Sequence, residues 1–225
     1  MFKFLIILFA VGGGMFFQRN PLLFGKRTGK SHDKFTVFKH YPQLDDELLP
    51  LADSVAGEFT AYRNHCLRVL TFTNYFLSES TRKKIPNALD LAAVALAYHD
   101  IALWTDHELD YLEPSKVRMD KALGDTYTPQ EIKIMEEIIL EHHKYTDFTG
   151  LSDAENDLIN AVRKGDWTDA SFGVVRFGMP AALLEAAYDQ VPELGFHQIL
   201  TNVLVRLSNG NLIKGTLELL KIFKW

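Results

Sequence analysis

The sequence predicts an all-α protein that folds as a single helical domain, and three observations lead to this prediction. From about residue 44 onward, apolar residues recur at helical spacing between turn residues, and no stretch shows the sustained alternation of a β-strand. A chain of 225 residues supports one domain with a substantial core and is too short for two ordinary domains. The apolar content of 47% and the charged content of 24% are those of a globular protein.

Residues 1–17 form a hydrophobic N-terminal segment in which Lys3 is the only charged residue. Residues 4–17 carry no charge, but these 14 residues fall short of the roughly 20 that a membrane-spanning helix needs. Several basic residues follow, which favours a catalytic part on the cytoplasmic side of a membrane. We therefore expect membrane attachment through residues 4–17. The alternatives are a signal peptide, although no clear small-x-small cleavage motif follows, and a misassigned start of a cytoplasmic enzyme.

Residues 18–43 are expected to be a linker, because they contain glycine and basic residues without a sustained periodicity. Residues 44–225 are expected to form the helical domain. Its first two helices are predicted at residues 45–56 and 58–77, and the basic, polar residues 78–86 are predicted to connect them to the next helix.

The most apolar helix is predicted at residues 88–102, with Asn87 as its N-cap. A continuously apolar, alanine-rich helix belongs at the centre of a helical bundle. His99 and Asp100 lie near the C-terminal end of this helix. We therefore expect the His-Asp pair to be buried.

The later helices are predicted from their start and stop residues. Thr128 and Pro129 are a cap and a first-turn proline, and Ser152 with Glu155 forms a capping pattern. Gly124 is expected to end the helix before it. The predicted ranges are 113–123, 128–143, 152–170, 178–190, 196–207 and 212–223.

The adjacent residues His99 and Asp100 suggest a metal site. Neutral imidazole and carboxylate are both good ligands for divalent metals, and a buried charge is costly unless it is paired or bound to a metal. His65 and Asp166 lie on separate predicted helices before and after this pair. Four such residues on successive helices are a much stronger signal than an isolated His-Asp pair.

The order His65, His99-Asp100, Asp166 resembles the HD-domain superfamily of metal-dependent phosphohydrolases, over roughly residues 40–207. This resemblance implies a single-domain helical bundle of the HD-domain type. It also implies one divalent metal ion, Zn, Mn, Co, Ni or Fe, held by His65, His99, Asp100 and Asp166. Further similarity to an uncharacterised HD subgroup lies in residues 62–65, 111–115 and 166–169.

The resemblance implies a hydrolase that uses a metal-activated water on a phosphomonoester or a nucleotide-like small molecule. Besides Asp100, the expected catalytic residues are His142 and His143, as hydrogen-bond donors or general acid, and Lys144, which would neutralise phosphate charge. One metal is favoured over two, because only residues 142 and 143 offer a good further position for histidine ligands. Substrate contacts are expected from Arg68, Trp104 and Asp169, and Asp169 is alternatively expected to support the metal ligands from behind.

One position departs from the bacterial nucleotidase branch that the spacings resemble. There a glutamate three residues after the His-Asp pair helps to orient the attacking water, and here that position is Leu103. Two alternatives therefore stay open. The first is an HD-domain hydratase or iron oxygenase that acts on a small non-phosphorylated molecule, and the second is a non-catalytic helical scaffold at a membrane.

The composition bounds the partners. A net charge of −5 gives no basis for nucleic-acid binding, so we expect a small-molecule substrate and no nucleic acid. Cys66 is the only cysteine, which excludes an intrachain disulfide, and we expect it to be a small buried side chain. No feature of the sequence predicts an oligomeric state.

Overall fold

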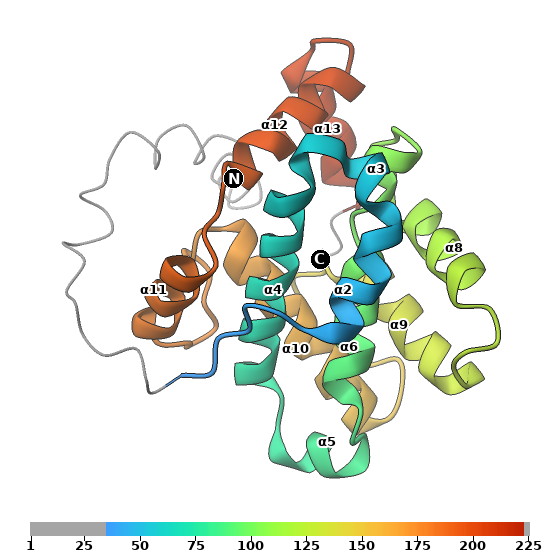
Figure 1. Cartoon of the computed structure of the whole chain (residues 1–225), viewed down its shortest axis with the longest axis vertical. Helices are drawn as coiled ribbons and strands as arrows, with labels where there is room; N and C mark the ends of the chain where they lie inside the picture. The colour runs from blue at the N-terminus through green and yellow to red at the C-terminus, as the bar shows by residue number, and fades with distance from the viewer. Residues whose placement is uncertain (1–34, 223–225) are drawn as a thin grey trace.

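The computed structural model of the chain describes residues 35–222, so the predicted hydrophobic segment at 1–17 lies outside the described residues. Within that range the structure is all-α and contains no strand, which confirms the predicted fold class (Figure 1). Two short 3-10 turns, η1 (Leu49–Leu51) and η2 (Ala56–Glu58), lie before α4. The α-helices are α2 (Pro42–Leu48), α3 (Ala52–Val55), α4 (Phe59–Phe76), α5 (Glu79–Lys84), α6 (Ala88–Tyr98), α7 (Ala102–Thr105), α8 (Leu112–Leu123), α9 (Pro129–Glu141), α10 (Asp153–Ala170), α11 (Ala181–Gln190), α12 (Phe196–Leu207) and α13 (Leu212–Ile222).

Helices with strong end signals form where the sequence predicts them. α9 and α10 begin with capping boxes, in which Thr128 and Ser152 cap the backbone and the glutamates three residues later reach back. α8 ends at Gly124, whose positive φ of 51° suits glycine. α12 has the same bounds as its predicted range.

Three local predictions need correction. The helix predicted at 45–56 is broken by η1, which contains Pro50, because proline has no N–H to continue the helical ladder. The connector predicted at 78–86 contains the short helix α5, capped by Ser78 through a 3.2 Å hydrogen bond from the Thr81 N–H. Asn87 precedes α6 but does not cap it, because its side chain donates to Glu131 instead.

The predicted central helix ends earlier than expected. α6 stops at Tyr98, and tight turns with backbone bonds from Ile101 N–H to Tyr98 O and from Leu103 N–H to Asp100 O follow before α7 begins. The His-Asp pair therefore lies in a sharp turn between two helices. This turn is well suited to aim both side chains into the protein interior.

α6 lies at the centre of the fold and packs against α2, α4 and α9. Residues 91–97 are fully buried. Residues 88–105 are long and apolar enough to cross a membrane. However, 83% of this stretch is buried inside the fold, as in the core helix of a soluble protein. Cys66 is buried as predicted, and burial raises the pKa of its thiol to about 12.

Two helices that carry candidate ligands, α4 and α10, pack closely against each other. Gly165 on α10 allows this approach, since a Cβ atom there would lie 2.8 Å from the Val69 carbonyl oxygen of α4. α12 and α13 pack together at one end of the bundle, beside the start of α4 (Figure 1). The site lies between these two pairs of helices.

Candidate metal centre

The four predicted metal ligands come together in the interior. His65 comes from α4, His99 and Asp100 from the turn after α6, and Asp166 from α10. Their exposed fractions are 1%, 0%, 5% and 3%, respectively. His65, His99 and Asp100 form a group whose ligand atoms all lie within 4.8 Å of one another.

The distances between these ligand atoms suit a shared ion. His65 Nε2 lies 3.2 Å from His99 Nε2 and 3.4 Å from Asp166 Oδ1, and His99 Nε2 lies 3.2 Å from Asp100 Oδ2. Ligands that bind zinc at about 2.0–2.2 Å are separated from one another by about 3.0–3.5 Å. The donor set, imidazole nitrogen with carboxylate oxygen, also suits a divalent transition metal.

The hydrogen bonds behind the two imidazoles fix which nitrogen faces the site. His65 Nδ1 lies 2.7 Å from Asp169 Oδ2, and His99 Nδ1 lies 2.7 Å from the Leu96 carbonyl oxygen. Both partners only accept, so each Nδ1 donates its proton and each Nε2 presents a lone pair. Two lone pairs that face each other at 3.2 Å call for a cation or a proton between them.

The electrostatics of the site lead to the same conclusion. Burial alone would lower the pKa of His65, but Asp166 and Asp169 raise it to about 9. Burial likewise opposes the charge on His99, but Asp100 raises its pKa to about 9. The buried carboxylates therefore favour a positive charge at this point, and a metal ion supplies one.

A second group of candidate ligands shares Asp100 with the first. Asp100, His142 and His143 also place ligand atoms within 4.8 Å of one another. His142 Nδ1 lies 2.7 Å from the Ile139 carbonyl oxygen, which leaves Nε2 facing Asp100 Oδ1 at 3.4 Å. Both atoms are buried, and within residues 35–222 neither meets hydrogen-bond geometry with a partner. The structure thus offers ligands for one ion, or for two ions that share Asp100.

A buried ion pair supports the site from behind. Arg68 Nε and Nη2 donate to the two carboxylate oxygens of Asp169 at 2.7 and 2.8 Å, and both side chains are fully buried. Burial would raise the pKa of Asp169, but Arg68 and His65 hold it far below its usual range. Asp169 therefore accepts from Arg68 and His65 together and fixes the orientation of the imidazole.

The three residues predicted to contact substrate, and Lys144, which was predicted to be catalytic, lie outside the lining of the cavity beside the site. Arg68 and Asp169 lie behind His65, Trp104 Nε1 donates to Glu58 Oε2 at 2.6 Å, and Lys144 Nζ lies 3.6 Å from Glu141 Oε2. Their roles toward a substrate stay predictions. The structure instead gives Arg68 and Asp169 a positioning role.

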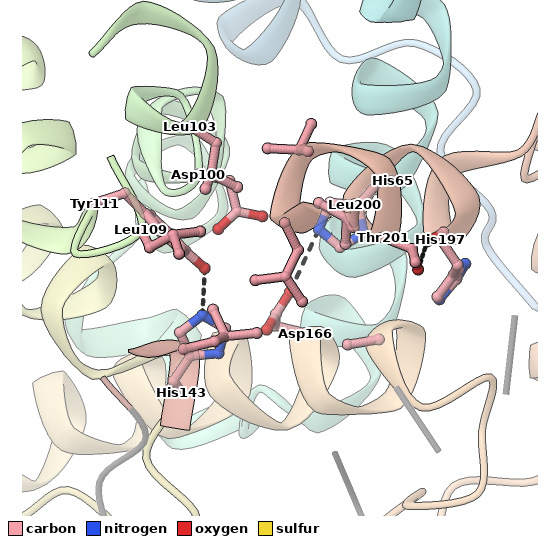
Figure 2. A pocket seen from close by; sticks show the side chains of 14 residues that line it. His65, Asp100, Leu103, Leu109, Tyr111, His143, Asp166, His197, Leu200 and Thr201 are labelled. Carbon is pink, nitrogen blue, oxygen red and sulfur yellow. Dashed lines mark hydrogen bonds and ion pairs between the residues drawn. The ribbon is translucent and has the colours of Figure 1, made fainter. Parts of the chain in front are cut away.

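A cavity of about 90 Å³ lies next to the candidate ligands (Figure 2). Its polar end is formed by three of them together with Tyr111. Its other end is formed by α12 and α13. The lining residues are His65, Asp100, Leu103, Leu109, Tyr111, His143, Asp166, Ala170, His197, Leu200, Thr201, Val203, Leu204 and Leu219.

Tyr111 and His143 form an uncharged pair on the cavity wall. Their hydrogen bond joins the Tyr111 hydroxyl to His143 Nε2 (Figure 2). Burial lowers the pKa of His143 to about 3, and burial raises the pKa of Tyr111 well above its ordinary value, so both stay neutral near pH 7. Tyr111 belongs to the 111–115 phrase of the resemblance. No pattern in the sequence singled out His197 or the apolar wall.

Comparisons of this chain with protein-family models, with curated proteins and with solved structures found no match. The class of this protein is therefore described from its own fold and site. It is an all-α protein with a buried group of histidine and aspartate side chains that can bind a metal ion. Such a group is compatible with a metal-dependent enzyme.

Proposed function

We propose that this protein is a metal-dependent hydrolase of the HD-domain type and that it cleaves a small phosphomonoester. The observation that carries the proposal is the convergence of two imidazole lone pairs and two carboxylates beside a cavity. A divalent metal at this position lowers the pKa of a bound water and polarises a substrate oxygen. A cavity of about 90 Å³ favours a small phosphomonoester over a nucleotide.

The residues around the candidate site would have different roles in the reaction. His65, His99, Asp100 and Asp166 would hold the ion, while Asp169 keeps the His65 proton on Nδ1. The Tyr111 hydroxyl lies on the cavity wall in hydrogen-bond contact with His143 Nε2, where it would also meet a water in the cavity. Tyr111 would thus orient the attacking water, at a site where Leu103 offers no carboxylate.

The first test is the metal content of the purified full-length chain, measured by mass spectrometry for the native protein and for Asp100→Asn. We expect one to two equivalents of a transition metal in the native protein and a loss of more than about tenfold in the variant. Asp125→Asn is the matched control, because Asp125 is an exposed carboxylate remote from the ligand groups. Equal metal content in all three proteins would contradict the ligand assignment.

One observation favours a second candidate function. Among the described residues no lysine or arginine lines the cavity, whereas phosphate-binding sites usually include such a cation. A hydratase or an iron-dependent oxygenase that acts on a small non-phosphorylated molecule fits this lining. A phosphatase panel, followed by oxygen uptake with the iron-loaded chain, separates the two candidates. Phosphate release from a small phosphomonoester supports the first, and oxygen consumption without phosphate release supports the second.

A further inference from the structure

We propose that the substrate carries a short, uncharged hydrocarbon group that lies against α12 and α13, while its reactive polar end faces the His/Asp group. This inference rests on the proposed function, because it assumes that the reaction takes place at the candidate metal site. It holds for a phosphomonoester and for a non-phosphorylated substrate alike. The substrate class is inferred from the apolar part of the cavity wall, which takes no part in the proposed reaction.

The cavity has two ends of different character. The candidate ligands and Tyr111 form one end (Figure 2). The other end is walled by leucine and valine side chains, three of which come from two adjacent turns of α12. The apolar residues of this end are Leu200, Val203, Leu204 and Leu219, while Leu103 and Leu109 lie beside Asp100 and Tyr111 (Figure 2).

The polar groups near the apolar end are already engaged within the protein. His197 contacts Glu193 Oε1 through Nδ1 at 2.8 Å and the Asp169 carbonyl oxygen through Nε2 at 3.0 Å. The Thr201 hydroxyl donates to the His197 carbonyl oxygen at 3.0 Å (Figure 2). A polar substituent placed at this end would lose its water and gain little in return. A hydrocarbon group suits it instead.

The charge of the lining residues and the volume of the cavity limit the class of substrate further. No lysine or arginine in the described part of the chain lines the cavity, so an anionic tail would be buried without a partner. A cavity of about 150 Å³ holds a benzene molecule, so the present 90 Å³ admits a group of about four carbon atoms. α12 is held against the site by Phe196, whose ring stacks on His65 at 4.3 Å between centroids. The wall is therefore fixed relative to the candidate ligands.

The test is a series of straight-chain hydroxamic acids with two to eight carbon atoms, titrated into the Zn²⁺-loaded full-length chain by calorimetry. The hydroxamate group binds the metal, so only the tail varies. We expect the affinity to rise about fourfold for each added methylene until the cavity is full, and then to fall. A tail that ends in a carboxylate should bind at least tenfold more weakly than the alkyl tail of equal length. An affinity independent of tail length, or a preference for the charged tail, would overturn the proposal.

Two matched variants locate the effect on the wall. Leu200→Asn should remove the dependence on tail length, while acetohydroxamic acid binds as before. Leu207→Asn is the control, because Leu207 is a half-buried leucine on the same helix that faces a separate hollow. Loss of the length dependence in the control variant alone would contradict the proposed location.

A metal-free experiment separates failure of this inference from failure of the proposed function. 1-Pentanol is titrated into the metal-free chain, and the methyl resonances of Val203 and Leu204 are followed by NMR. Saturable shifts at these methyl groups support the apolar end even if the chain binds no metal. Absence of such shifts overturns the inference even if metal content and hydrolysis confirm the site.

Discussion

The contact between α4 and α10 differs in kind from the wall that α12 and α13 place across the cavity. The first contains a buried polar network, since Asp169 on α10 accepts from Arg68 and contacts His65 Nδ1, both on α4, at 2.7–2.8 Å. The second is almost wholly apolar toward the cavity. The comparison shows that α4 and α10 hold two of the four candidate ligands in a polar network, whereas α12 and α13 present the apolar wall that we propose contacts the substrate.

This difference has an energetic basis. A hydrogen-bonded charge pair in the interior specifies one geometry, but it is strongly destabilising when one partner is removed. An apolar wall is adaptable, because exchanging one hydrocarbon side chain for another of similar volume costs little. Changes on α4 and α10 should therefore affect stability and metal binding, whereas changes on α12 and α13 should affect ligand choice.

The largest effect is expected for Asp169→Ala. It leaves the Arg68 guanidinium buried without its carboxylate, which should lower the free energy of unfolding by about 3–5 kcal/mol. It also frees His65 Nδ1, which should weaken metal binding by about 10- to 100-fold. Urea denaturation and metal titration measure the two effects. The control is Asp125→Ala on the surface, and equal stability of the two variants would mean that the ion pair does not organise this contact.

Gly165→Ala should have the next largest effect. The added methyl group would meet the Val69 carbonyl oxygen at 2.8 Å and Thr73 Oγ1 at 3.0 Å, so α4 and α10 must separate. We expect a loss of about 1–3 kcal/mol in the free energy of unfolding. Metal affinity should fall with it, because Asp166 is the next residue. Gly57→Ala, where a Cβ atom meets nothing within 4 Å, serves as control. A stability loss below about 0.5 kcal/mol would show that the helices can adjust.

A further effect is the pH dependence of the metal-free chain. The pKa values of His65 and His99 are raised to about 9 in the folded state, from 6.5 in the unfolded chain. Their contribution to stability is therefore fully present below pH 6.5 and is lost as the pH rises through about 9. Urea denaturation of chelator-treated protein between pH 6 and 9.5 checks this. His99→Gln should flatten the profile, and a stability that rises over the window would contradict the assigned contacts.

The sequence predicted most of the helices because their ends carry strong local signals. α9 and α10 start at capping boxes, and α8 ends at a glycine with positive φ. It did not predict the end of α6, because nothing in the local composition stops that helix before the His-Asp turn. α5 was missed because its cap, Ser78, lies in a stretch whose charges resemble those of a connector.

The site was predicted in part for the same kind of reason. The four candidate ligands were identifiable from their order along the chain, and the structure brings them together. The cavity wall was not predicted, and two roles stayed open for Asp169, facing the substrate or supporting the ligands, since the choice depends on contacts between distant segments. Asp169 meets Arg68 from 101 residues away, and the wall forms only when α12 and α13 fold back over the cavity.

The histidines are anchored over different distances in the chain, and this difference bears on folding. His99 and His142 each donate Nδ1–H to the carbonyl oxygen three residues earlier, whereas His65 depends on Asp169, which is 104 residues away. The first two anchors form with their own helix ends, within about a microsecond, and the third needs the chain to close a long loop. Added metal is therefore expected to engage the segments around residues 99 and 142 first and to speed the docking of α4 onto α10. Metal binding at the candidate centre would then speed the last step of folding, in addition to its proposed role in the reaction.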